Sequence, residues 1–259
     1  MASENRYLIG TSGWSFKDWV GTFYPADTQQ RGMLACYVHH FETVEINYTF
    51  YRLPSARTME SIAAKAPESF RFWVKANQAA THDLDRTVSR PFLDGLAPML
   101  DSGKFAGLLL QFPQRFHRTV ANRKCLSVAL EDYRSVPLAV EFRHQSWQHP
   151  SVLQGLRDRD VTLVIPDVPD LPGLYRQAAA ATNRTGYLRL HSRDASKWYN
   201  EGGADRYDYS YSREELDELI EAWEALEEPM DEVYTFFNNC HHGQAAQNAE
   251  ALRRILGQI

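Results

Sequence analysis

The sequence contains few cysteines and no long apolar run. Its three cysteines, Cys36, Cys125 and Cys240, are an odd number at wide spacing, which does not suit a disulfide framework and fits a reducing compartment. No apolar run approaches the roughly 20 residues that a membrane-spanning helix needs. Residues 1–6 lack the apolar core of a signal peptide. These absences predict a cytoplasmic protein without a membrane partner.

The chain also lacks a strong excess of either charge. Its formal net charge is −5 at pH 7, from 28 lysines and arginines against 33 aspartates and glutamates. It therefore has no overall basic footprint of the kind that binds nucleic acid in bulk, although a local basic groove is not excluded. No linker or low-complexity tract divides the 259 residues, and a chain of this length can bury a core without disulfides or a structural metal. We expect a single domain over residues 1–259.

Eight short apolar runs are spaced along the chain, and nearly all of them end in polar or charged residues. They cover residues 8–9, 44–46, 72–74, 107–110, 138–140, 163–165, 187–190 and 233–237. Stretches that we interpret as helices lie between them, around 30–40, 55–66, 90–102, 119–132, 150–158, 212–227 and 242–257. Strands that alternate with single helices indicate a parallel sheet, and eight such units predict an α/β fold of the (β/α)8 TIM-barrel type. No glycine-rich dinucleotide-binding turn follows the first run, which disfavours a Rossmann fold.

Two connections depart from this regular alternation. Between the sixth and seventh runs, Val168–Thr185 is rich in proline and has only a short alanine-rich stretch at 178–181, so the sixth helical unit is expected to be irregular. After the seventh run, Asp194–Tyr211 is a long polar connection that contains Trp198 and Tyr199. On a barrel, this connection would form a lid-like loop over the site.

The alternation of side chains along a strand predicts which residues face the barrel interior. In the seventh run, Leu188 and Leu190 are apolar and should pack on the helices, which turns Arg189 and His191 inward. The same argument applied to the other strands gives a polar inner set at their carboxyl ends: Glu45, Asn47, Lys75, Asn77, Gln111, Glu141, Arg143 and Asp167. Because neighbouring strands lie about 4.8 Å apart, these groups could share one cavity. The alternative is a structural layer in which the buried charges only neutralise one another.

Several of these strand ends occur together with further short motifs. The segments are Gly10–Trp14 with Phe23–Pro25, Glu42–Tyr51, Phe72–Ala76 with Thr81–His82, Leu110–Pro113, Val140–His144 with Trp147, Tyr187–His191, Tyr207–Ser212, and Phe237–Asn239 with Gly243, Ala245 and Asn248–Ala249. In combination, and over essentially the whole chain, they resemble the DUF72 (YecE-like) family of proteins of unknown function. The resemblance implies a TIM-barrel-type fold, and it implies no reaction. Ser192 departs from the family pattern, which usually has glycine after the histidine of the seventh strand.

The inner set favours an enzyme that performs acid–base chemistry on a small anionic, for example phosphorylated, substrate. We interpret Glu45 and Glu141 as an acid–base pair and His191 as a proton carrier or an orienting group. The other residues expected to bind substrate, as cations, hydrogen-bonding groups or a stacking aromatic, are Trp14, Asn47, Lys75, His82, Gln111, Arg143, Asp167, Arg189, Asn238 and Asn239. The reaction would belong to the hydrolase, lyase or isomerase classes, and no cofactor is expected. Simple capping of the last helix would equally explain Asn239 and Gly243.

Two other function classes remain open from the sequence. Glu141, Asp167 and His191 are residue types that bind Zn or Mn, as in a metal-dependent phosphoesterase, a nuclease or a sugar isomerase. The neighbouring cations disfavour this alternative, since they can neutralise the carboxylates without a metal. The second alternative is a non-catalytic module whose loop aromatics, such as Trp14 and Trp198, stack on nucleic acid or carbohydrate. Nucleic acid is the less favoured partner because of the acidic net charge, and the sequence leaves the oligomeric state open.

Overall fold

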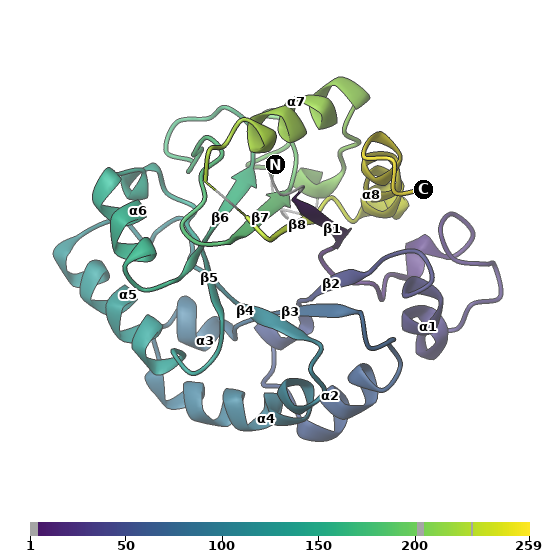
Figure 1. Cartoon of the computed structure of the whole chain (residues 1–259), viewed down its shortest axis with the longest axis horizontal. Helices are drawn as coiled ribbons and strands as arrows, with labels where there is room; N and C mark the ends of the chain where they lie inside the picture. The colour runs from purple at the N-terminus through teal and green to yellow at the C-terminus, as the bar shows by residue number, and fades with distance from the viewer. Residues whose placement is uncertain (1–4, 201–204, 229) are drawn as a thin grey trace.

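The computed structural model describes residues 5–200, 205–228 and 230–259. Eight parallel strands surround a common centre, and helices pack outside them (Figure 1). The strands are β1 (Arg6–Thr11), β2 (Thr43–Ile46), β3 (Arg71–Lys75), β4 (Phe105–Gln111), β5 (Leu138–Glu141), β6 (Thr162–Asp167), β7 (Thr185–Leu190) and β8 (Glu232–Phe237). The α-helices are α1 (Met33–Tyr37), α2 (Ala56–Ala63), α3 (Gln78–Thr81), α4 (Ser89–Asp101), α5 (Val120–Asp132), α6 (Pro150–Arg157), α7 (Arg213–Glu224) and α8 (Gln244–Ile255). The predicted TIM-type barrel is confirmed.

The seventh helix shows how local sequence sets the ends of an element. Ser212 accepts a hydrogen bond from the backbone N–H of Glu215, and the Glu215 side chain accepts one from the backbone N–H of Ser212. This capping box satisfies two N–H groups that the first helical turn leaves without partners. The apolar residues Leu216, Ile220 and Trp223 then recur at helical spacing and are buried against the barrel. No helix among the described residues is both long and apolar enough to cross a membrane.

The connection between β6 and β7 is irregular, as predicted. Residues 168–184 contain no helix, and this includes the alanine-rich stretch at 178–181. Proline supplies no backbone N–H, so Pro169 and Pro172 disfavour helix in this segment. Leu174 instead forms an isolated antiparallel bridge with His144, which ties the segment to the loop that follows β5.

The barrel is nearly closed, with a seam between β1 and β2. The hydrogen-bonded order runs from β1 through β8 and β7 to β2, and the described residues form no ladder between β1 and β2. A tyrosine hydroxyl on α1 bridges the seam: Tyr37 accepts a hydrogen bond from the backbone N–H of Thr11 at 2.9 Å and donates one to the carbonyl of Thr43 at 3.1 Å. The strands also approach closely here, since a Cβ placed on Gly10 would lie 2.2 Å from the Thr43 oxygen.

The interior of the barrel is a compact apolar plug distinct from the larger core between the sheet and the helices. Its buried residues are Leu8, Trp73, Leu109, Ala139, Val164, Tyr187, Tyr234 and Phe236. Such filling by layers of side chains is usual for an eight-stranded parallel barrel. The plug closes the barrel below the carboxyl ends of the strands, so a site at those ends is bounded on its inner side by apolar side chains.

The face assignment is confirmed for most strands and wrong for β6. Ile165 was expected inside, with Asp167 on the same face, but the interior residue of this strand is Val164. Ile165 belongs to the outer core, and Asp167 bonds Arg193 at 3.0 Å. Residues 163–165 are all apolar and show no alternation, so the sequence does not mark the face. An error of one residue then reverses every side chain of the strand.

Candidate functional site

A buried guanidinium occupies the centre of the carboxyl end of the barrel. Arg189, on β7, donates from Nε and Nη2 to the two carboxylate oxygens of Glu45 on β2, at 2.8 and 2.7 Å. Its Nη1 donates to Glu141 on β5. The hydroxyl of Tyr187, two residues earlier on the same face, donates to Glu45 at 2.6 Å. All four side chains are almost fully buried. Through these hydrogen bonds, Arg189 connects a carboxylate on β2 to a carboxylate on β5.

A second cation continues this network towards solvent. Arg143, just after β5, forms an ion pair through Nε with Glu141, and its side chain is 15% exposed. Its Nη2 lies 3.2 Å from Nε2 of His191, whose Nδ1 lies 2.9 Å from the Asn238 amide. Nη1 of Arg143 makes no hydrogen bond to any described residue and is reached by solvent. The structure therefore leaves the N–H groups of Nη1 available to a ligand.

The charges in this network fix the protonation state of Glu141. Burial by itself would raise the pKa of the Glu141 carboxyl, but the cations of Arg143 and Arg189 outweigh it and hold that pKa well below its usual range. For Arg189, burial by itself would lower the pKa of the guanidinium. The carboxylates of Glu141 and Glu45 outweigh burial and raise that pKa well above its usual value. At neutral pH, Glu141 is therefore a carboxylate and Arg189 a cation.

His191 is neutral in this environment. Burial and then the charge of Arg143 lower the pKa of the imidazole to about 3. A neutral imidazole has one N–H and one lone pair, while the guanidinium of Arg143 can only donate. The lone pair therefore lies on Nε2, facing Arg143, and the proton lies on Nδ1, next to the Asn238 amide. His191 thus joins the second cation to β8.

Lys75, at the end of β3, is the cation of this region without a carboxylate partner. Among the described residues no carboxylate lies within ion-pair distance of its Nζ, which sits 4.2 Å from the centre of the Phe50 ring. Burial lowers the pKa of the amine to about 7, and the charge of Arg189 acts in the same direction. The carboxylates of Glu141 and Glu45 oppose the shift without cancelling it. At neutral pH, a substantial fraction of Lys75 is therefore the neutral amine.

His82 lies next to this lysine. Its ring is 5.0 Å from that of Phe50 and nearly perpendicular to it, and its Nδ1 is 2.9 Å from the hydroxyl of Thr81. Burial and then the charge of Lys75 lower the pKa of His82 to about 4. Phe50 and His82 thus form one uncharged side of the space around the Lys75 amine.

Other side chains expected in the site make structural contacts. Asn77 caps α3 by accepting from the backbone N–H of Ala79 at 3.1 Å. Asn239 donates to the carbonyl of Tyr209 at 2.7 Å and to Asn248 on α8 at 2.9 Å, so it ties the loop after β7 to the last helix. These contacts fix the frame around the site.

Four further expected residues differ in how far they reach the network. Gln111 lies beside Glu141 in the strand register, and its amide nitrogen donates to the Phe112 carbonyl at 2.9 Å. The buried Oδ1 of Asn47 has no hydrogen-bond partner among the described residues. Trp14 lies partly buried in the loop after β1, and Asp167 lies on the outer face of β6 as described above.

The donor set offers no ready metal centre within the described part of the chain. Nε2 of His191 lies 3.7 Å from Oε1 of Glu141. Asp167, the third ligand of the alternative metal site, lies on the outer face of β6 and pairs with Arg193. No group of three or more histidine, cysteine, aspartate or glutamate side chains among the described residues is arranged to hold an ion.

Sequence reasoning missed two residues of this site. The sequence pattern places Tyr187 in an apolar run, yet its hydroxyl donates a hydrogen bond to Glu45. The available signal was its position two residues before Arg189, on the same face of β7. Phe50, which covers the Lys75 amine, follows β2 in a short 3-10 turn, and no strand alternation reaches it.

A family model described as "Protein of unknown function DUF72" matches residues 8–259. The chain belongs to the DUF72 family. The UPF0759 protein YunF of Bacillus subtilis is 30% identical to this DUF72 protein, in an alignment covering 96% of this chain and 94% of YunF. A DUF72 family protein of Thermotoga maritima has 35% identity and a TM-score of 0.89, with 98% of this chain and all of that one covered. A DUF72 family protein of Enterococcus faecalis has 26% identity and a TM-score of 0.86, with 97% and 95% covered.

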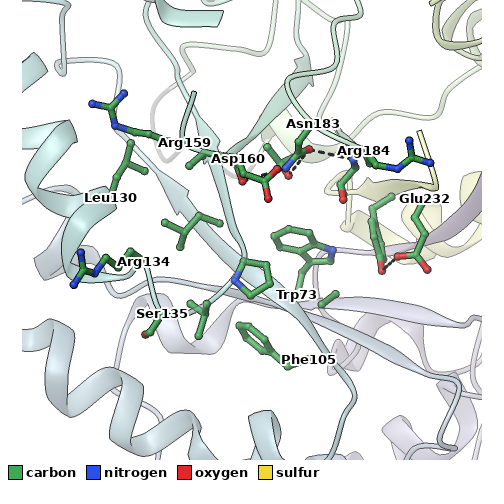
Figure 2. Close-up of a pocket in the computed structure, with 18 of the residues that line it drawn as sticks. Trp73, Phe105, Leu130, Arg134, Ser135, Arg159, Asp160, Asn183, Arg184 and Glu232 are labelled. Atoms are coloured by element: carbon green, nitrogen blue, oxygen red, sulfur yellow. Dashed lines mark hydrogen bonds between the residues drawn. The ribbon is translucent and has the colours of Figure 1, made fainter. Parts of the chain in front are cut away.

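A cavity of about 1120 Å³ in this DUF72 protein opens at the opposite, amino end of the barrel (Figure 2). Its lining includes the first residue of every strand from β3 to β8. Charges of both signs surround it, and Arg134 and Arg184 form ion pairs with Glu131 and Asp231. The amino end of a TIM barrel generally serves stability, whereas the carboxyl end carries the chemistry. We therefore place the candidate site at the carboxyl end.

Proposed function

We propose that this protein is an enzyme that moves a proton on a small anionic substrate at the carboxyl end of the barrel. The observation that carries the proposal is the Lys75 amine, which has a pKa of about 7 and no carboxylate partner. A proton-transfer group works best when its pKa lies close to the working pH. Among the charged side chains of the site, Lys75 meets that condition at neutral pH.

The other groups in the proposal hold charge and position. The nitrogens of Arg189 are occupied by Glu45 and Glu141, so this residue fixes the two carboxylates and is not free to bind an anion. The solvent-accessible Nη1 of Arg143 is the guanidinium group that would bind the anionic part of the substrate. Lys75 carries the proton. The fixed charges and dipoles around the substrate come from Glu45, Glu141 and His191. No cofactor is required for this step.

The test uses proton exchange with solvent, because it needs no knowledge of the product. A panel of 2-oxo acids, hydroxycarboxylates and sugar phosphates is incubated with the protein in D2O and followed by 1H NMR. We expect catalysed exchange for at least one compound class, with a rate that rises as pH increases through about 7, because the neutral amine is the base. Lys75→Met should lower the rate by about 100-fold or more.

The matched control is Lys65→Met, which removes an exposed lysine just after α2. This variant should exchange at the wild-type rate. Equal rates for Lys75→Met and the wild type would contradict the proposal, as would a panel in which no compound exchanges faster than it does with Lys75→Met.

A further inference from the structure

The lysines of this protein differ in what their amines contact. Nζ of Lys104 donates to the carbonyls of Ala63 and Ala66, and Nζ of Lys197 pairs with Asp208. Lys75 has neither kind of contact among the described residues, and its Nζ lies over the face of the Phe50 ring. An amine without a hydrogen-bonded partner keeps its lone pair available once it loses its proton.

The charges that act on Lys75 explain why it has no ion pair. Glu45 and Glu141 are each bound by Arg189, and Arg143 pairs with Glu141 a second time. Two carboxylates and two guanidiniums already balance, so no carboxylate is left over for the lysine. A positive charge at Nζ is nevertheless tolerated, since an aromatic face stabilises a cation above it. The surroundings thus accept both a neutral amine and a cation at the same atom.

We propose that Lys75 forms a Schiff base with a small carbonyl compound that carries a carboxylate or phosphate group, an inference that rests on the proposed function of the same site. Lysine is the side chain that makes such intermediates with carbonyl substrates when desolvation or a cationic neighbour activates it. Here the amine has both, in its burial and in the charge of Arg189.

The step balances without a co-reactant. The lone pair of Nζ attacks the carbonyl carbon, the electrons of the C=O bond move to oxygen, and a carbinolamine forms. The two protons of the amine pass to that oxygen, which leaves as water while the C=N bond forms. Uptake of one proton from solvent then gives the iminium ion, whose charge lies over Phe50 where the ammonium charge lay before. The free Nη1 of Arg143 would hold the anionic group of the substrate.

The iminium form gives Lys75 a second way to promote proton exchange, distinct from acting as the base itself. An iminium withdraws electrons from the adjacent carbon and makes its proton easier to remove. In this form the nitrogen has no lone pair to take that proton, which passes to solvent, so Lys75 activates the substrate and solvent exchanges the proton. This account restricts the substrate to carbonyl compounds, which the proposed function alone does not.

Reductive trapping tests the inference on the intact protein. The protein is incubated with pyruvate or with dihydroxyacetone phosphate, treated with sodium borohydride, digested, and analysed by mass spectrometry. We expect the peptide that contains Lys75 to gain the mass of one probe molecule less one oxygen atom, with at least one of the two probes. A pyruvate adduct would indicate a carboxylate substrate, and a dihydroxyacetone phosphate adduct would indicate a phosphate ester.

Two variants keep the outcome interpretable. Lys75→Arg retains a cation but cannot form the imine, and it should give no adduct while its circular dichroism spectrum and thermal midpoint stay close to wild type. Lys65→Met should give the wild-type adduct at Lys75. Labelling of Lys65 and Lys75 to the same extent in the wild type would overturn the inference, because it would be non-selective. Absence of any adduct together with Lys75-dependent proton exchange would overturn the Schiff base and leave the proposed function standing, and absence of both would overturn both.

Discussion

Replacement of Arg189 by methionine tests whether the buried network is held by this one side chain. The substitution removes three charge-assisted hydrogen bonds, two to Glu45 and one to Glu141. Glu141 keeps its ion pair with Arg143, but Glu45 keeps only the hydroxyl of Tyr187. Breaking a buried ion pair by removing one partner costs about 3–5 kcal/mol, because the other charge stays buried without compensation. We expect Arg189→Met to lower the free energy of unfolding by that amount at pH 7.

The measurement is urea-induced unfolding, followed by circular dichroism and tryptophan fluorescence. The second variant is Glu45→Gln in the Arg189→Met background, which removes the uncompensated charge and keeps the side-chain shape. It should be more stable than Arg189→Met alone and retain a loss on the order of 1–3 kcal/mol from the unmade hydrogen bonds.

The pH dependence of the free energy of unfolding supplies an independent check on the role of Arg189. In the wild type, the lowered pKa of Glu141 contributes stability above the unfolded-state pKa of glutamate, and this contribution is lost as the pH falls through the folded-state pKa. In Arg189→Met, Glu141 keeps only the cation of Arg143, so its pKa is lowered less and the variant has less of this contribution to lose. The difference in free energy of unfolding between wild type and variant should therefore narrow as the pH falls below the usual pKa of glutamate, about 4.5. A loss below about 1 kcal/mol at pH 7, or a double variant no more stable than the single one, would refute the argument.

Two further predictions concern the seam and the neutral imidazole. Tyr37→Phe should lower the free energy of unfolding by about 1–3 kcal/mol, because the Thr11 N–H and the Thr43 carbonyl lose their bridge. Tyr199→Phe, at a 59% exposed tyrosine, is the matched control, and equal stability of both variants would contradict the bridge. The His191 ring should stay neutral in NMR titrations down to about pH 5, since its pKa is about 3, and Arg143→Met should raise that pKa. Protonation of wild-type His191 near pH 6.5 would show that burial and Arg143 do not control it.

Much of the barrel follows from local sequence. A strand shows itself by a short apolar run, and a helix by apolar residues at helical spacing and by caps such as Ser212 with Glu215. Where a strand alternates, as around Arg189 on β7, its faces also follow, since the period of two is a property of the backbone. On β6 the apolar run at 163–165 hides that period, and the sequence gives the wrong face for Asp167.

The chemistry of the site depends on contacts that only the closed barrel makes. Arg189 and Glu45 are 144 residues apart in the chain, so no local pattern predicts their hydrogen bonds. Nor does any local pattern predict that Lys75 has no carboxylate partner. The sequence by itself determined the barrel, the polar carboxyl end and the kinds of side chain gathered there. The tertiary structure decided which charges neutralise one another and which amine stays free. The physical reason is that periodicity and capping act over a few residues, whereas ion pairing depends on distances set by the whole ring of strands.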